Sequence, residues 1–191
     1  KIYDKLVEWK KNSDGKTALL IEGARRIGKS TIVELFAKNE YENYLIIDFN
    51  IAPNEIKDLF INERSDIDLI LQKLQSFYGK VLPVRKSLII FDEVQFCPEA
   101  RSMIKYLVAD GRYDYLETGS LISIKKNVEN ILIPSEERKI NMYPLDFEEF
   151  LWTLNDNATI PFLRDCYINK KKVDIAHKRI MKDFRTYILV G

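Results

Sequence analysis

Short apolar runs alternate with amphipathic segments along the first three quarters of the chain. Five runs have the composition of buried strands: residues 18–22, 44–49, 87–91, 113–117 and 139–142. Apolar residues recur at helical spacing in the segments before and between them: residues 3–9, 29–39, 65–77 and 98–108. Because parallel strands are joined through crossover helices, this alternation predicts an α/β fold with a parallel sheet covered by helices on both faces.

One helix carries a start signal of its own. Ser65 is followed three residues later by Asp68, which resembles a capping box. The apolar residues that follow share one helix face: Ile67, Ile70, Leu71, Leu74 and Phe77. We therefore expect a helix that Ser65 caps and whose apolar face includes Phe77.

The pattern becomes entirely helical after residue 145. Helices are predicted over 147–154 and about 160–168, and a longer one follows in which Val173, Ile180 and Ile188 share a face. The chain therefore divides into a core, residues 1–145, and a helical segment, residues 146–191, that is a subdomain or the beginning of one.

Residues 23–30, Gly-Ala-Arg-Arg-Ile-Gly-Lys-Ser, match the phosphate-binding pattern G-x-x-x-x-G-K-[ST] between a predicted strand and a predicted helix. Glycines allow the backbone N–H groups to surround phosphates, Lys29 would reach the β- and γ-phosphates, and the Ser30 hydroxyl would coordinate Mg²⁺. The residues expected to hold the nucleotide are Gly23, Ala24, Arg25, Arg26, Ile27, Gly28, Lys29, Ser30 and Thr31. Arg25 and Arg26 either neutralise phosphate or are solvated.

An acidic pair ends the third apolar run. Asp92 would hold Mg²⁺ opposite Ser30, and Glu93 would polarise the water that attacks the γ-phosphate. A solvated strand end is the alternative for such a pair when it stands alone. Here it follows Lys29 by 63 residues with a strand between them, a pattern typical of additional-strand P-loop ATPases.

Other nucleotide enzymes fit less well. No Asn-Lys-x-Asp guanine signature is present, since Asn169-Lys170 is followed by two lysines. Small-molecule P-loop kinases generally lack the Glu beside the Asp, so a metabolite kinase is a weaker hypothesis. At the end of the fourth run, Thr118 or Ser120 could face the γ-phosphate as a sensor, and Ser120 is preferred; a simple strand-ending turn is the alternative.

Composition fits a folded protein, with 46% hydrophobic and 31% charged residues over 191 positions. The two cysteines are too few and too far apart for a disulfide framework or a zinc site. No apolar run reaches the roughly 20 residues of a membrane span, and no signal-peptide pattern opens the chain. We therefore expect a cytoplasmic protein that does not enter membranes.

Charge is distributed unevenly, although the net charge is only +1. Residues 164–191 hold eight basic and three acidic residues, whereas residues 1–163 hold 22 basic and 26 acidic ones. Three interpretations of this basic C-terminal helix stay open: contact with DNA, a solvated face of an amphipathic helix, and contact with another subunit or with the nucleotide.

Taken together, these segments resemble the prokaryotic AAA+ superfamily ATPases of largely uncharacterised function, in the origin-recognition and signalling-ATPase branch. The matching pieces are Gly-Ala-Arg-Arg-Ile-Gly-Lys-Ser at 23–30, Phe-Asp-Glu-Val-Gln at 91–95, Thr-Gly-Ser at 118–120 and Met-Tyr-Pro-Leu-Asp-Phe-Glu-Glu-Phe-Leu at 142–151. The last piece is specific, because phosphate chemistry alone would not predict it.

The resemblance implies a three-layer core with sheet order 5-1-4-3-2, followed by the start of a helical lid or winged-helix region. Family members usually continue into a nuclease-like domain, and we expect this chain to continue beyond Gly191. Arg138, where the family commonly has Gly-Arg and this chain has Glu137-Arg138, would be an arginine finger or sensor; a surface arginine is the alternative. Gln95 matches the Asp-Glu-x-Gln of the family and could read the state of the γ-phosphate.

The expected function is Mg²⁺-dependent ATP binding and hydrolysis coupled to a conformational change, with Lys29, Glu93, Ser120 and Arg138 as catalytic residues. The alternative is a nucleotide-dependent switch with little turnover that controls a partner, DNA or a further domain. A homo-oligomer is possible under either hypothesis, because arginine fingers often act between subunits.

Overall fold

Five parallel strands form the central sheet of the computed structural model, which describes residues 1–120 and 136–190. The strands are β1 (Ala18–Gly23), β2 (Asn43–Asp48), β3 (Ser87–Asp92), β4 (Asp114–Ser120) and β5 (Glu137–Met142). Their order is β2-β3-β4-β1-β5, and every neighbouring pair is parallel. The expected α/β fold and the expected strand order are confirmed.

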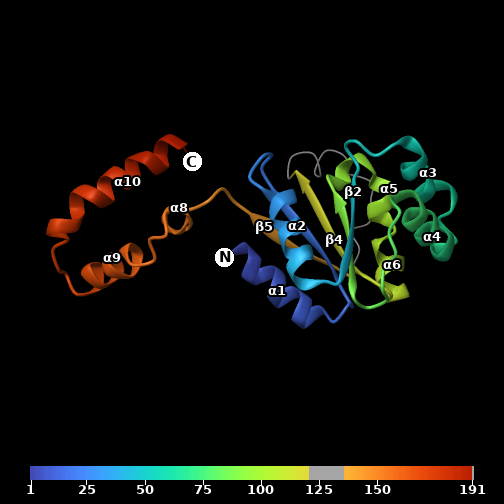
Figure 1. Ribbon diagram of the computed structural model, residues 1–191, viewed down its shortest axis with the longest axis horizontal. Helices are drawn as coiled ribbons and strands as arrows, with labels where there is room; N and C mark the ends of the chain where they lie inside the picture. The colour runs from blue at the N-terminus through green and yellow to red at the C-terminus, as the bar shows by residue number, and fades with distance from the viewer. Residues whose placement is uncertain (121–135, 191) are drawn as a thin grey trace. The chain divides into compact units, whose positions relative to one another are not determined.

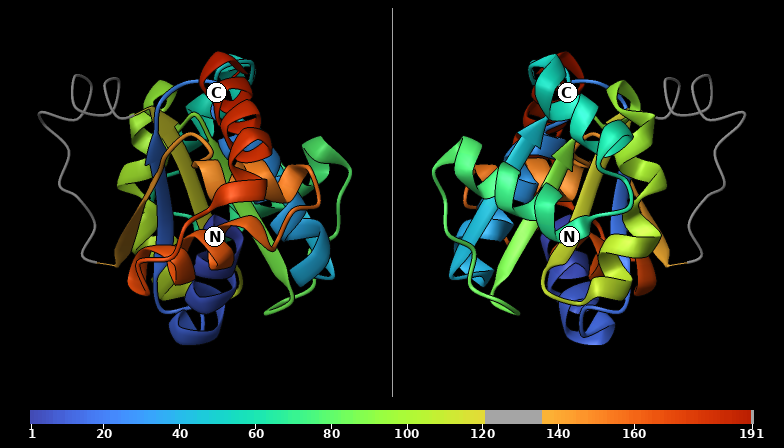
Figure 2. Two further views of the ribbon diagram at one scale, coloured as in Figure 1. Left: turned by 90° about the vertical axis from the view of Figure 1, so that its left-hand side faces the viewer. Right: turned by 90° about the vertical axis from the view of Figure 1, so that its right-hand side faces the viewer.

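Helices cover both faces of this sheet (Figure 1, Figure 2). On one face lie α1 (Ile2–Ser13) and α2 (Lys29–Glu40). On the other face lie α3 (Asn54–Asn62), α4 (Ile67–Tyr78), α5 (Pro98–Ser102) and α6 (Ile104–Asp110), with a 3₁₀ turn at Val94–Phe96. The molecule is therefore a three-layer structure in this region.

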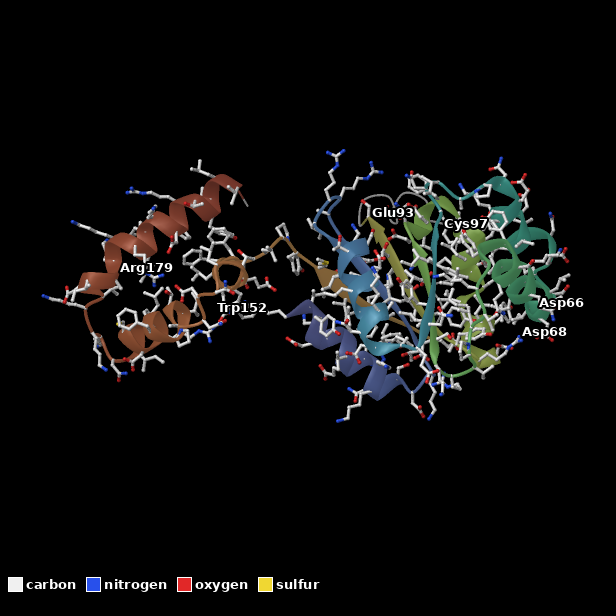
Figure 3. The ribbon with its side chains drawn as sticks, in the orientation of Figure 1. Asp66, Asp68, Glu93, Cys97, Trp152 and Arg179 are labelled. Carbon is white, nitrogen blue, oxygen red and sulfur yellow. The ribbon has the colours of Figure 1, made fainter. Side chains whose placement is uncertain are left out.

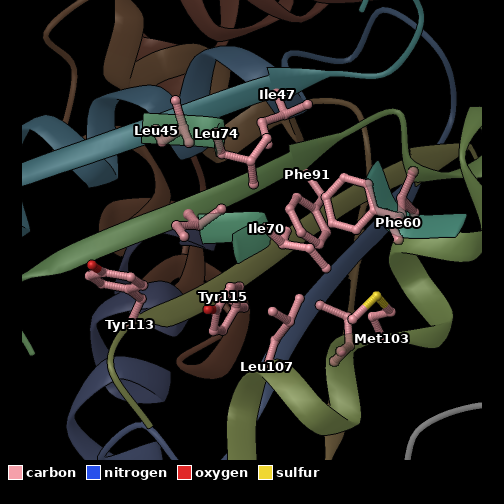
Figure 4. Packing of buried hydrophobic residues seen from close by; sticks show 14 of the residues in the cluster. Leu45, Ile47, Phe60, Ile70, Leu74, Phe91, Met103, Leu107, Tyr113 and Tyr115 are labelled. Carbon is pink, nitrogen blue, oxygen red and sulfur yellow. The ribbon is translucent and has the colours of Figure 1, made fainter. Parts of the chain in front are cut away.

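The strands alternate between two hydrophobic cores, because successive side chains of a strand point to opposite faces. Leu19 and Ile21 of β1 belong to the core beneath α1 and α2, with Phe36, whereas Ala18 and Leu20 belong to the core beneath α3–α6. Figure 4 shows the second core, whose labelled residues include Ile47, Phe60, Ile70, Phe91 and Tyr115. Both faces of the sheet are apolar, which explains why its strands are continuous apolar runs.

Four details differ from the sequence-based expectations. Helix α3 was not expected, and the single helix expected over 98–108 is broken at Met103 into α5 and α6. The cap of α4 is Asp66, which accepts a hydrogen bond from the Leu69 amide at 2.9 Å, so the assignment to Ser65 was wrong. Phe77 is 57% exposed and does not join the core.

Residues Tyr143–Gly191 form a second compact unit, separate from Lys1–Met142. Its elements are α8 (Phe147–Thr153), α9 (Thr159–Ile168), a 3₁₀ turn (Asp174–Ala176) and α10 (His177–Val190). Aromatic rings of α8 and α10 pack together, with Phe147 and Phe184 centred 5.2 Å apart. Within the described part of the chain, none of the helices is long and apolar enough to cross a membrane.

Candidate nucleotide-binding site

Except for Arg138, the catalytic and binding residues singled out in the sequence come together at the carboxyl-terminal edge of the sheet, where ligands of parallel α/β folds bind. The phosphate-binding loop follows β1, the acidic pair ends β3, and Thr118 and Ser120 end β4. Strand β4 lies between β1 and β3, so its end lies beside both the loop and the acidic pair. Glu93 is labelled at this edge in Figure 3.

The loop backbone has the alternating conformation that turns N–H groups toward a common centre. Arg26 and Gly28 are both left-handed, with φ of 61° and 89°. Gly23 is needed for a different reason: a Cβ added there would lie 2.4 Å from the backbone oxygen of Met142 in β5. The loop therefore has the shape of an anion-binding nest, and its first glycine allows it to pass close to the neighbouring strand.

Helix α2 continues from this loop and points its N-terminus at the centre of the nest. Its first turn carries no acidic side chain, so the partial positive charge of the helix end is not offset. Lys29 is only 4% exposed, and its Nζ donates to the carbonyl oxygens of Ala24 at 2.7 Å and Gly23 at 3.3 Å. A buried ammonium group and a free helix N-terminus thus meet at one place, which suits a polyanionic ligand.

Asp92 is the centre of a buried hydrogen-bond network. Its Oδ1 accepts from Ser30 Oγ at 3.0 Å and also from Thr118 Oγ1. Thr118 Oγ1 in turn accepts from the Glu93 amide at 3.1 Å. Asp92 is nearly inaccessible, whereas Ser30 is exposed.

Carboxylate and hydroxyl oxygens are ligands that Mg²⁺ prefers, so Ser30 and Asp92 fit a magnesium site. Within residues 1–120 and 136–190, no group of three or more His, Cys, Asp or Glu side chains is arranged to hold a metal. A magnesium ion here would therefore have one carboxylate and one hydroxyl from the protein. This fits Mg²⁺, which commonly completes its coordination with substrate phosphates and water.

Glu93 stands next to this network with an unusual backbone. Its φ of 52° is left-handed, which turns the chain from β3 into the following 3₁₀ turn. Its side chain is partly exposed, and its carboxylate accepts a hydrogen bond from Gln95 Nε2. A carboxylate at this position is accessible and yet held in place, as a proton acceptor for a bound water must be.

Asp48 is a third acid at this edge that the sequence analysis did not single out. It ends β2 and pairs in register with Asp92 of β3. Partial burial raises the pKa of its carboxyl group, and the negative charges of Asp92 and Glu93 add to the effect. Its position near the end of the predicted strand 44–49 was the available signal.

The strand register places the two candidate sensors beside different parts of the site. Thr118 lies one residue beyond the Phe91–Glu117 pair and so reaches Asp92, whereas Ser120 is opposite Gly23 at the start of the loop. Two residues of a strand span about 6.6 Å, so the two hydroxyls occupy different parts of the site. Thr118 contacts the acidic pair, whereas Ser120 lies beside the loop, and the preference for Ser120 as the sensor stays a prediction.

Arg138 is not brought to the loop or to the acidic pair. It pairs in register with Leu19, four residues before Gly23, a separation of roughly 13 Å along the strand. It lines a surface pocket beside α1, together with Lys5 and Trp9. A finger or sensor role in the site of its own chain therefore has no support in the geometry.

The remaining loop residues are accessible. Ala24, Arg25, Arg26 and Thr31 are exposed, and Ile27 is half-buried.

Cys97, by contrast, is buried, and burial raises the pKa of its thiol to about 11. A thiol in such surroundings is inert, which agrees with a structural role for Cys97.

Two comparisons with known proteins bear on this site. A family model described as an AAA domain matches residues 15–151, which include the loop, the acidic pair and Thr118. Among solved structures, the chain is similar to the ORC1 protein of Aeropyrum pernix in complex with DNA, with a TM-score of 0.51 and 11% identity. That match covers 80% of this chain and 47% of the other, so the chain spans about half of that protein's length and shares its fold. No curated protein matches this sequence.

Proposed function

Because the chain belongs to the AAA domain family, we propose that it binds ATP together with Mg²⁺ and hydrolyses it to ADP and phosphate. The observation that carries the proposal is the network around Asp92. A loop hydroxyl and a buried carboxylate are in contact there, next to a held but accessible glutamate. A protein that only binds nucleotide has no need of that glutamate.

Each residue has a role that follows from its position. The backbone of Gly23–Thr31 and the Lys29 ammonium bind the phosphates, and Ser30 and Asp92 hold Mg²⁺, which neutralises phosphate charge when bound. Glu93 accepts a proton from a water whose oxygen bonds to the γ-phosphorus. The bond from that phosphorus to the bridging oxygen breaks, and ADP leaves with the bonding electrons. Thr118 fixes the backbone of Glu93 relative to Asp92.

Two variants test the proposal: ATP turnover is measured for Glu93→Gln, and ATP affinity is measured for Lys29→Ala. We expect Glu93→Gln to bind ATP normally but to lose turnover by about 100-fold or more, the usual contribution of a general base. Lys29→Ala should lose roughly 100-fold in ATP affinity, since charge-assisted hydrogen bonds contribute about 1.5–3 kcal/mol each. Glu55→Gln, a change at an exposed glutamate of α3, is the matched control and should leave both quantities unchanged.

The outcomes separate hydrolysis from binding. A wild-type turnover no higher than that of Glu93→Gln would exclude hydrolysis and leave the nucleotide-dependent switch as the function. A Lys29→Ala variant that binds ATP as tightly as wild type would contradict the assignment of the loop itself.

Contact with DNA through the second unit is a further candidate function. Lys170, Lys172, Lys178, Lys182 and Arg185 are exposed there, and the similar ORC1 structure was determined with DNA. Arg179, which is labelled in Figure 3, is a poor candidate for such contact, because its guanidinium group donates to Asp156 and Thr159, both at 2.6 Å.

The test of this second candidate measures how the affinity for a DNA duplex depends on salt concentration. It compares wild type with a variant in which Lys170, Lys171 and Lys172 are replaced by Gln. We expect weaker binding and a shallower salt slope, because each lost phosphate contact removes about 0.9 from that slope. The control changes three exposed lysines of the first unit, Lys5, Lys11 and Lys16. Equal losses in both variants, or no wild-type binding at low salt, would exclude the specific role of the second unit.

A further inference from the structure

Gln95 is a buried polar residue beside the proposed catalytic glutamate. It lies in the 3₁₀ turn that follows Glu93 and is 3% exposed. Its Nε2 donates to Oε2 of Glu93. Burying an amide group costs free energy unless it is hydrogen bonded, so the turn is stable only with such contacts in place.

Backbone hydrogen bonds and core packing hold the turn. The amide of Phe96 donates to the Glu93 carbonyl at 3.0 Å, and the amide of Cys97 donates to the Val94 carbonyl at 3.0 Å. Val94 and Cys97 are buried in the core beneath α3–α6. Gln95 therefore extends from a backbone that the core holds, and its amide group is aimed from a fixed point.

Glu93 needs such a partner because its backbone alone does not orient its carboxylate. The Glu93 amide is held by Thr118, but three side-chain torsions separate that backbone from the carboxylate. Among the described residues, the donor that reaches this carboxylate is Gln95. The contact occupies Oε2 and leaves Oε1 able to accept a proton.

We propose that Gln95 is a positioning residue that orients the Glu93 carboxylate for proton transfer from the attacking water. The inference rests on the proposed hydrolysis and deepens it. An amide suits this task because it is neutral: it donates one directed hydrogen bond without forming an ion pair that would compete with the water. Gln95 acts through Glu93 and holds no part of the nucleotide.

The test compares Gln95→Leu with wild type in ATP turnover and nucleotide binding. The leucine side chain has a similar size and suits a buried position but donates no hydrogen bond. We expect kcat to fall by about 10-fold to 100-fold, since a small misplacement of a catalytic group costs up to about 100-fold. KM for ATP and the affinity for ADP should stay within about twofold, because Gln95 belongs to the turn after β3 and not to the phosphate-binding loop.

A double variant distinguishes positioning from a general structural effect. If Gln95 acts through Glu93, then Gln95→Leu should cause no further loss in a Glu93→Gln background, because residues that act as a unit are non-additive. The matched control is Gln75→Leu, a partly buried glutamine whose amide bonds to the Leu71 and Leu82 backbone. It should lower stability without changing kcat.

Several outcomes would overturn the inference. One is a turnover of Gln95→Leu equal to or above that of wild type. Another is a loss of turnover in the Glu93→Gln background as large as the loss that Gln95→Leu causes in wild type. If Gln95→Leu does not fold, Gln95→Asn keeps the amide but shortens its reach by one methylene and should show the same loss of kcat. A wild type no faster than Glu93→Gln would instead remove the proposed hydrolysis, and this inference with it.

Discussion

Successive residues of strand β4, Glu117 and Thr118, face two different buried polar clusters on opposite sides of the sheet. Thr118 joins the network around Asp92. Glu117 lies on the other side, where Arg101 of α5 forms a bidentate ion pair with Glu137 of β5 at 3.0 Å. Both clusters contain charged groups that are withdrawn from water, yet only the first has the geometry of a site.

The difference lies in access rather than in residue chemistry. In the first cluster Ser30 is exposed and Glu93 is partly exposed, so a ligand can reach them. In the second, the side chains of Arg101 and Glu137 are 1% and 0% exposed, and their charges are paired with each other. The charged groups beside the open loop can therefore bind a ligand. The enclosed pair of Arg101 and Glu137 instead joins α5 to β5.

Arg101→Leu tests whether the enclosed ion pair stabilises the fold. Removing one member of a buried ion pair leaves the other without compensation, and we expect a loss of about 3–5 kcal/mol in the free energy of unfolding. Urea denaturation measures it. Replacing Arg64, an exposed arginine that donates to Ser102, should cost less than about 1 kcal/mol.

A second variant checks the cause of that loss. Replacing Arg101 and Glu137 together by apolar residues of similar volume should recover much of the stability, because neither charge is then left unpaired. ATP affinity per folded molecule should remain unchanged throughout. A specific loss of ATP affinity in a folded Arg101 variant would break the distinction between the two clusters.

The nucleotide loop, the acidic pair and the strands could be predicted because each is a local signal. The buried strands are continuous apolar runs, and the loop pattern occupies consecutive residues between a strand and a helix. Membership of the AAA domain family confirms the resemblance that these segments suggested. Helix α3 was missed because it lacks a side-chain cap and buries only two of its nine residues, Ile56 and Phe60.

Features that depend on strand register could not be predicted in this way. The choice between Thr118 and Ser120 depends on which residue of β4 lies beside Asp92. The ion pair of Arg101 joins residues 36 positions apart, and no local pattern connects them. Glu137 stands where the expected Gly-Arg pattern has glycine, and its carboxylate forms the ion pair with Arg101.

Glu117 makes the stability of the folded protein depend on pH. Burial, followed by the nearby negative charge of Glu137, raises the pKa of Glu117 well above its usual range. The folded protein therefore keeps a proton on Glu117 that the unfolded chain releases above about pH 4.5, so the unfolded state binds fewer protons. The stabilisation is complete below the unfolded pKa and is lost as pH rises toward the folded pKa, at no more than about 1.4 kcal/mol per pH unit.

Glu117→Gln should remove this dependence, because glutamine resembles the protonated acid and does not titrate. We expect the melting temperatures of the variant and wild type to be similar at pH 5 and the variant to be the more stable at pH 8. Glu55→Gln, at an exposed site, should follow wild type at both values. A Glu117→Gln variant that loses stability with pH as steeply as wild type would show that Glu117 is ionised in the folded protein. The second cluster would then carry an uncompensated negative charge, and its description as an enclosed, neutralised group would have to be given up.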